Sequence, residues 1–192
     1  MRVISVVPTP NPDALKFTLD TELVSDGSRS FTSKSGAAKD PIAAKIFELE
    51  GVTSVFYMGD FVTVNKAFDV SWDVLEPQIL DTVKLVVAPG AAPANGALHE
   101  TAVMEVPANK PFDEMTPAQR ILLIDRLMED EIRPGLAGDG GGLEIVGLED
   151  FVLQIHYEGA CGSCPSSSAG TLSYIENLLR ERVDGRLKLV PV

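Results

Sequence analysis

The sequence predicts an α+β protein made of two small two-layer domains. Three observations support this fold class. Short β-branched strands alternate with amphipathic helices over residues 1–87, an Ala/Pro/Gly-rich stretch begins at residue 88, and a second helix-and-strand pattern covers residues 116–192. We therefore predict a first domain at 1–87, a linker at 88–115 and a second domain at 116–192. With 45% hydrophobic residues in 192, the chain can build a core in each domain.

The first domain is predicted to have the order β-β-α-β-β-α. Strands are expected at residues 3–7 and 15–19, followed by a loop at 25–39, where Ser, Gly and Lys predominate. Asp40 and Pro41 provide an N-cap and a first-turn proline for a helix that ends near Leu49. A hairpin at 52–57 and 61–64 and a helix at about 72–87 complete the domain, and Pro77 is expected to kink that helix or delay its start. The domain has no Cys or His, and no spacing in it indicates chemistry.

The second domain is predicted to have the order α-β-β-α-β. Residues 116–119 form a capping box for a helix that Pro134 is expected to end, and residues 135–142 are interpreted as a flexible glycine-rich connector. Strands are expected at 143–146 and 151–157, then a helix at about 171–183 and an edge strand at 187–190. Alternation places His156 on the solvent face of its strand, and His99 falls in the linker, so neither is a persuasive metal ligand.

The charge and hydropathy of the chain exclude several classes of partner. The net charge is −12 and Lys and Arg do not cluster, so we expect neither nucleic acid nor a membrane surface as a partner. No apolar run approaches the 18 or so residues of a membrane span, and residues 1–5 lack the pattern of a signal peptide. We expect a cytoplasmic protein, or one of an organelle matrix from which a targeting peptide has been removed.

The two cysteines of the chain, Cys161 and Cys164, form a CxxC motif. A predicted strand precedes the motif and a predicted helix follows it, so the thiols lie where unpaired N–H groups and the helix dipole lower a thiol pKa. Two cysteines in a chain of this size do not form a disulfide framework. In a reducing compartment such a pair binds a metal or is redox-active.

Three kinds of site agree with this motif. A thiol–disulfide oxidoreductase has its CxxC early in a thioredoxin-like fold, whereas here the motif comes late in the sequence. Structural zinc takes four protein ligands, and a [4Fe–4S] or [2Fe–2S] cluster takes four thiolates, so one chain supplies half of either site. A second chain related by a twofold axis would supply the other half.

Two groups of motifs resemble the NifU-like (Nfu) family. The run around Cys161 and Cys164 is similar to the signature of the Nfu C-terminal domain, and so are two stretches upstream: 132–134 (Ile-Arg-Pro) and 139–141 (Asp-Gly-Gly). The Nfu N-terminal domain is resembled by four stretches: 8–12 (Pro-Thr-Pro-Asn-Pro), 14–17 (Ala-Leu-Lys-Phe), 51–52 (Gly-Val) and 54–56 (Ser-Val-Phe). The resemblance covers both domains in the same order.

The resemblance implies a scaffold or carrier and not an enzyme. Such a protein binds a labile iron–sulfur cluster, [4Fe–4S] in preference to [2Fe–2S], in a homodimer bridged by the cluster, and passes it to apo-proteins. It implies a ligand role for Cys161 and Cys164 only, and it implies client apo-proteins and assembly proteins as partners. A structural zinc-binding protein or a thiol-redox CxxC protein is the alternative.

Overall fold

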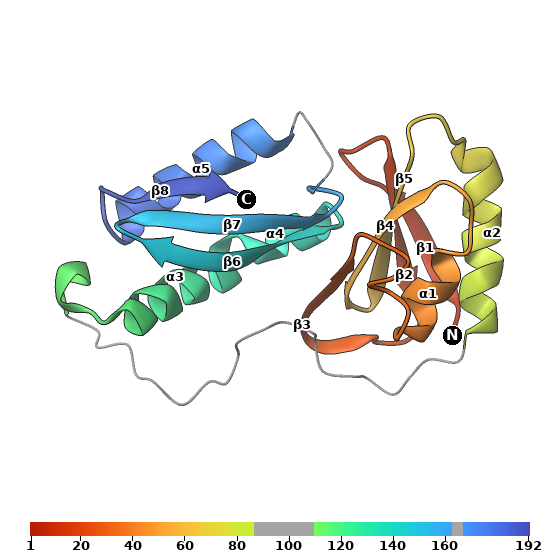
Figure 1. Cartoon of the computed structure of the whole chain (residues 1–192), viewed down its shortest axis with the longest axis horizontal. Coiled ribbons are helices and arrows are strands. Elements are labelled where there is room, and N and C mark those ends of the chain that lie inside the picture. The colour runs from red at the N-terminus through yellow and green to blue at the C-terminus, as the bar shows by residue number, and fades with distance from the viewer. Residues whose placement is uncertain (87–109, 163–166) are drawn as a thin grey trace.

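The computed structural model describes residues 1–86, 110–162 and 167–192. It contains a five-stranded sheet in the order β1-β2-β5-β4-β3 and a three-stranded sheet in the order β6-β7-β8, each with its own helices and its own hydrophobic core (Figure 1). The chain therefore has two small α+β domains, as predicted.

All neighbouring strands of the first sheet are antiparallel. The elements of this domain are β1 Val3–Pro8, β2 Ala14–Leu19, β3 Val24–Phe31, α1 Pro41–Ile46, β4 Val52–Gly59, β5 Phe61–Lys66 and α2 Trp72–Leu85. Asp40 caps α1 through bonds from two backbone N–H groups, and Ser71 caps α2. Helix α2 starts at Trp72 and continues through Pro77, so the expectation of a later start is wrong.

Strand β3 corrects the predicted order of the first domain, which is β-β-β-α-β-β-α. It lies in the stretch 25–39, which was predicted to be a loop from its Ser, Gly and Lys residues. Pairing with β4 overrides this composition, and Phe31 at the end of β3 is buried against Tyr57 with 5.8 Å between ring centroids. The irregular register between Val24 and Ser28 accommodates Gly27, whose φ is 71°.

The second sheet combines an antiparallel β6–β7 pair with a parallel β7–β8 pair. The elements of this domain are η1 Phe112–Glu114, α3 Pro117–Glu131, α4 Arg133–Gly138, β6 Gly141–Glu149, β7 Val152–Gly159, α5 Ser167–Arg182 and β8 Lys188–Pro191. The capping box at Thr116 and Gln119 is present. Leu153 and Ile155 of β7 point into the core, as alternation predicted.

Two features of the second domain differ from the sequence prediction. Pro134 does not lead into a connector, because it lies in the first turn of α4, where a helix needs no N–H from that residue. Leu136 of α4 is buried in the core, and Gly141 and Gly142 are already part of β6. Phe112 and Met115, in the stretch assigned to the linker, are buried in this core as well. The boundaries at residues 87 and 115 otherwise stay predictions.

The buried ion pair between Asp40 and Arg29 connects β3 to the start of α1, and a substitution at Asp40 tests how much this connection stabilises the fold. Arg29 of β3 donates to Asp40 over 2.9 Å, and both side chains are almost fully buried. Asp40→Ala removes the cap and leaves the guanidinium without this carboxylate, so we expect a loss of about 3 kcal/mol in the free energy of unfolding. Asp81→Ala, which breaks an exposed pair with Lys84, should change it by less than about 0.5 kcal/mol. Denaturant unfolding of both variants measures the difference, and equal losses would contradict this role of Asp40.

Candidate functional site

Cys161 lies in a tight turn that follows β7. Within residues 159–162, which we call the Cys161 turn, the N–H of Gly162 donates to the carbonyl of Gly159 over 3.2 Å. The N–H of Ala160 donates to the carbonyl of Gly140 over 3.1 Å, which ties the turn to the residue preceding β6. Cys161 is the third residue of the turn and is half-buried. Cys164 lies outside the described residues, so the joint action of the two thiols stays a prediction.

The Cys161 turn packs against the start of β6 at a distance that only glycine permits. A Cβ atom added at Gly141 would lie 2.5 Å from the Cys161 Sγ atom and 3.0 Å from the carbonyl oxygen of Glu158. Gly140 and Gly159 have φ values of 77° and 63°, in the left-handed region that favours glycine. The run 139–142 is part of the stretch 135–142 that was interpreted from sequence as a flexible connector. Its glycines instead pack closely against the Cys161 turn.

The residues before Cys161 carry shifted pKa values. Burial, and then the charge of Cys161, raises the pKa of Tyr157 to about 12, so its phenol is neutral at physiological pH. The Tyr157 hydroxyl is buried and has no hydrogen-bond partner in the part of the chain that the structure describes. Burial also raises the pKa of Glu158, and a hydrogen bond from Ser28 opposes that shift. Both groups belong to the last residues of β7, so the thiol lies at the edge of a largely desolvated region.

The first domain contacts the Cys161 turn directly. The side-chain amide of Asn65 donates to the carbonyl of Gly159, and that of Asn11 donates to the carbonyl of Ala160, each over 3.0 Å. In Figure 1 the end of the β6–β7 pair points at the first sheet, on the side away from α2. A small hollow beside Cys161 is lined from both domains, by Pro10 and Asn11 of the first and by residues such as Thr171 of the second.

Three more contacts join the domains around this point. The Lys16 ammonium donates to the carbonyl of Ala137 over 2.7 Å, and the Ser28 hydroxyl donates to the Glu158 carboxylate over 2.8 Å. The ring of Phe56 lies against the second domain, because a Cβ atom added at Gly142 would be 2.9 Å from it. No spacing in the sequence of the first domain indicates chemistry, and these contact residues were not predicted from it. One signal was available: Thr63 and Asn65 are polar residues that alternate with Val62 and Val64 in a central strand, and both are buried.

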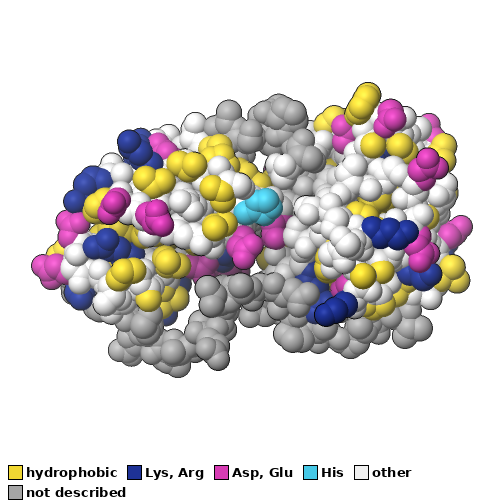
Figure 2. Space-filling view, in the orientation of Figure 1, with side chains coloured by type: hydrophobic (Ala, Val, Ile, Leu, Met, Phe, Trp, Pro, Cys, Tyr) yellow, Lys and Arg dark blue, Asp and Glu magenta, His cyan; other side chains and the backbone are white. Residues whose placement is uncertain are grey.

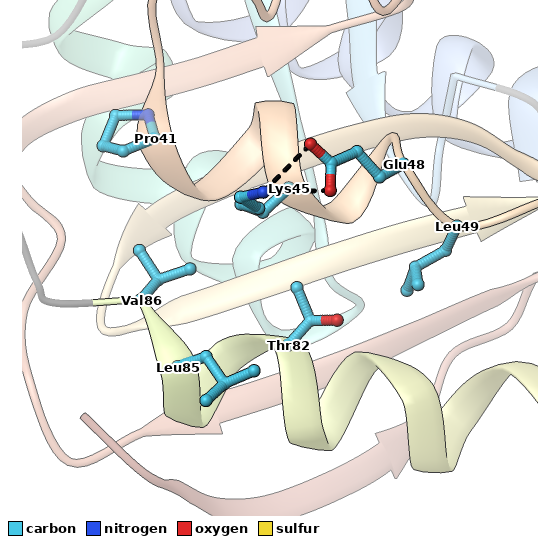
Figure 3. A pocket seen from close by; sticks show the side chains of 7 residues that line it. All are labelled: Pro41, Lys45, Glu48, Leu49, Thr82, Leu85 and Val86. Carbon is cyan, nitrogen blue, oxygen red and sulfur yellow. Dashed lines mark hydrogen bonds and ion pairs between the residues drawn. The ribbon is translucent and has the colours of Figure 1, made fainter.

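Elsewhere in the described part of the chain, His156 and one groove are the remaining candidates for a site. The described residues contain no group of three or more His, Cys, Asp or Glu that could hold a metal ion. His156 is exposed, as predicted, and its Nδ1 atom lies 2.9 Å from the carbonyl oxygen of Val192. His99 lies outside the described residues. A groove on the helical side of the first domain carries one exposed ion pair, Lys45–Glu48 (Figure 3). Its lining residues are Pro41, Lys45, Glu48, Leu49, Thr82, Leu85 and Val86.

On the face drawn in Figure 2, basic and acidic side chains are interspersed over both domains. The expected absence of a nucleic-acid partner stays a prediction. Within the described ranges, no helix is both long and apolar enough to cross a membrane.

Comparisons with known proteins match both domains. The family model for the scaffold protein Nfu/NifU N terminal matches residues 4–90, and that for the NifU-like domain matches residues 124–190. NifU-like protein 5, mitochondrial, of Arabidopsis thaliana is 36% identical over 91% of this chain and 62% of its own length. The NFU1 iron-sulfur cluster scaffold homolog, mitochondrial, of Homo sapiens is 32% identical over 90% of this chain and 65% of its own length.

Solved structures are also similar to part of the chain. The solution structure of a NifU-like protein from Saccharomyces cerevisiae is 30% identical, with a TM-score of 0.38, and the match covers 43% of this chain and 77% of that chain. The present chain spans a little over three-fifths of the length of the two curated relatives.

A substitution at Gly141 tests whether its close contact with Cys161 determines the position of the thiol. We expect Gly141→Ala to push the turn away, because the new methyl group meets the Sγ atom and a backbone carbonyl, and to raise the alkylation rate of Cys161 about three- to tenfold. Gly147→Ala in the same strand is the matched control, since a Cβ atom there meets nothing within 4 Å. The rates are read by mass spectrometry of the labelled peptide. Equal rates in both variants would show that Gly141 does not set the position of the thiol.

Proposed function

Because this chain belongs to the NifU-like (Nfu) family, with a family model matching each of its domains in order, we propose that it carries iron–sulfur clusters. Two observations support the proposal. One is the family match, and the other is a CxxC motif whose first cysteine lies in a turn at the end of β7 that packs against glycines. In this proposal Cys161 and Cys164 are the iron ligands, and the protein passes the cluster to apo-proteins. Relatives are named as iron-sulfur cluster scaffolds, which supports a carrier without catalytic turnover.

The ligand count favours a cluster shared by two chains. A [4Fe–4S] or [2Fe–2S] cluster needs four ligands, and each chain has two cysteines. His156 is an exposed side chain on β7 whose Nδ1 atom lies against the carbonyl oxygen of Val192, so it is not placed to replace a cysteine. We propose a [4Fe–4S] cluster between two copies, with [2Fe–2S] as the second choice. Thiolates at a subunit boundary keep the cluster accessible, as transfer requires.

The partners follow from this role. Apo-proteins would receive the cluster, and assembly proteins would supply it. The relatives named above are mitochondrial forms, so an organelle matrix is a candidate compartment beside the cytoplasm expected from sequence. Both are reducing environments in which the two thiols stay available for iron.

Removal of either cysteine tests the site. We expect Cys161→Ala and Cys164→Ala each to abolish cluster binding, since two chains would then supply only two of the four thiolates. Anaerobic reconstitution followed by iron and sulfide counts and an absorption spectrum measures binding. The unfolding midpoint is the control for the fold, and we expect it to be nearly unchanged.

Three outcomes would contradict the assignment. Wild-type iron content in either variant would exclude that cysteine as a ligand. Bound zinc in place of iron and sulfide would favour the structural zinc alternative. Disulfide exchange with a protein substrate, without cluster binding, would favour the thiol-redox alternative.

Cluster loading and dimerisation should be coupled. We expect one [4Fe–4S] cluster per two chains, and removal of the iron by a chelator should return monomers, because a ligand that needs two chains stabilises the dimer by mass action. The net charge of −12 opposes association of the metal-free chains. Sedimentation of both forms, with iron counted in each species, measures this. A loaded monomer would mean that an outside thiol completes the site.

A further inference from the structure

We propose that Asn11 and Asn65 of the first domain are positioning residues for Cys161, so that docking of the first domain determines how long the second domain keeps its cluster. The part of this proposal that concerns cluster retention rests on the proposed function. The contacts that support the positioning role are present in the chain without a metal. It assigns the first domain a part in the site itself.

The two amides hold the two peptide carbonyls that directly precede Cys161. Asn65 donates to the Gly159 carbonyl and Asn11 to the Ala160 carbonyl, each over 3.0 Å. The Gly159 carbonyl also accepts the bond that closes the Cys161 turn. Both asparagines are more than nine-tenths buried, with exposures of 3% for Asn11 and 1% for Asn65. Buried amides with defined partners restrict backbone motion more than exposed ones, which exchange with water.

Each asparagine is itself held in place by its own domain. The Asn11 Oδ1 atom accepts from the N–H of Asp13, and the Asn11 carbonyl accepts from the Thr9 hydroxyl. The Asn65 amide also contacts the Ser54 hydroxyl on the neighbouring strand β4. Their amides are therefore fixed relative to the first sheet, so the carbonyls they hold move with that sheet.

The domain contact fits closely enough to transmit this constraint. Cβ atoms added at Gly140 and Gly159 would lie 2.9 Å from Thr63 Oγ1 and 2.8 Å from the Phe56 ring, so the first sheet touches the backbone on both sides of the turn. The Lys16 and Ser28 contacts lie at other points of the same junction. Because these contacts are spread over the junction, we expect the docked domains to hold one orientation.

The experiment replaces the amide donors in the full-length chain. Asn11→Asp keeps the Oδ1 acceptor for Asp13 and removes the donor to Ala160, and Asn65→Asp removes the donor to Gly159. Asn11→Ala and Asn65→Ala are measured in parallel because they introduce no charge. They show whether an effect of the aspartate variants comes only from a folding defect caused by a buried charge. Asn177→Asp, at an exposed position of α5, is the matched control.

Two readouts separate positioning from general stability. In the metal-free protein we expect the alkylation rate of Cys161 to rise about three- to tenfold for each asparagine variant, the scale of one lost hydrogen bond. In the loaded protein we expect cluster loss to a chelator to accelerate by a similar factor, with the initial iron content unchanged. Ser28→Ala loosens the junction at Glu158 without touching the turn, so it should leave the alkylation rate within about twofold of the wild type.

The proposal is overturned if the asparagine variants keep wild-type alkylation rates, or if Ser28→Ala raises the rate as much as they do. The second result would mean that any weakening of the junction exposes the thiol. If the wild-type chain binds no cluster but the asparagine variants still alter Cys161 alkylation, the proposed function fails and the positioning role stands.

Discussion

The position of Cys161 depends on close backbone contacts that only glycine allows. Five glycines lie in or beside the Cys161 turn, at positions 140, 141, 142, 159 and 162, and a methyl group at any of them would meet another atom within 2.9 Å. At Gly141 and Gly159 the nearest atoms are the Cys161 Sγ atom and the Gly140 carbonyl oxygen, both beside the turn. At Gly140 and Gly142 they are Thr63 and Phe56 of the first domain. The same short segments, around residues 140–142 and 159, therefore pack against both the Cys161 turn and the first domain.

The central strand of the first sheet, β5, is buried on both of its faces, which is unusual in an antiparallel sheet of a small two-layer domain. Every residue of β5 is buried. Val62 and Val64 contribute to the first core, whereas Thr63 and Asn65 alternate with them and lie on the opposite face. Such a face would normally be polar and solvated. Here Asn65 forms a hydrogen bond to the second domain, so the junction between the domains is polar. Because hydrogen bonds depend on direction, we expect the two domains to dock in one fixed orientation.

Local signals in the sequence predicted the starts of α1 and α3 and most strands, because their causes lie within a few residues, whereas α4 was missed and α5 starts at Ser167, before the predicted residue 171. The capping box at Thr116, the N-cap at Asp40 and the alternation of Leu153 and Ile155 are of this kind. The CxxC motif and the family resemblance likewise identified the candidate site without any tertiary information. These predictions need no knowledge of distant segments.

The missed features depend on partners distant in the sequence. Strand β3 has a loop-like composition and forms because β4 pairs with it. The glycines near residue 140 look like a flexible connector until the Cys161 turn, some twenty residues later, packs on them. Asn11 lies in a proline-rich stretch, and its acceptor is Ala160, 149 residues away. No local pattern encodes such a pairing, so the contact between Asn11 and the Cys161 turn could be found only from the tertiary structure.

If the chain is a carrier as proposed, a site divided between two domains suits it, because a carrier must hold its cargo and then release it. If the competent form of the turn is the docked one, apparent affinity scales with the fraction of chains in which the domains are docked. A recipient that competes for the first sheet would lower this fraction without touching iron. Release would then need no change in the thiolates themselves, and the strength of the iron bonds would not have to be compromised for transfer. The polar character of the junction supports this, since hydrogen bonds such as those of Asn11 and Asn65 can be exchanged for bonds to water at small net cost when the domains part.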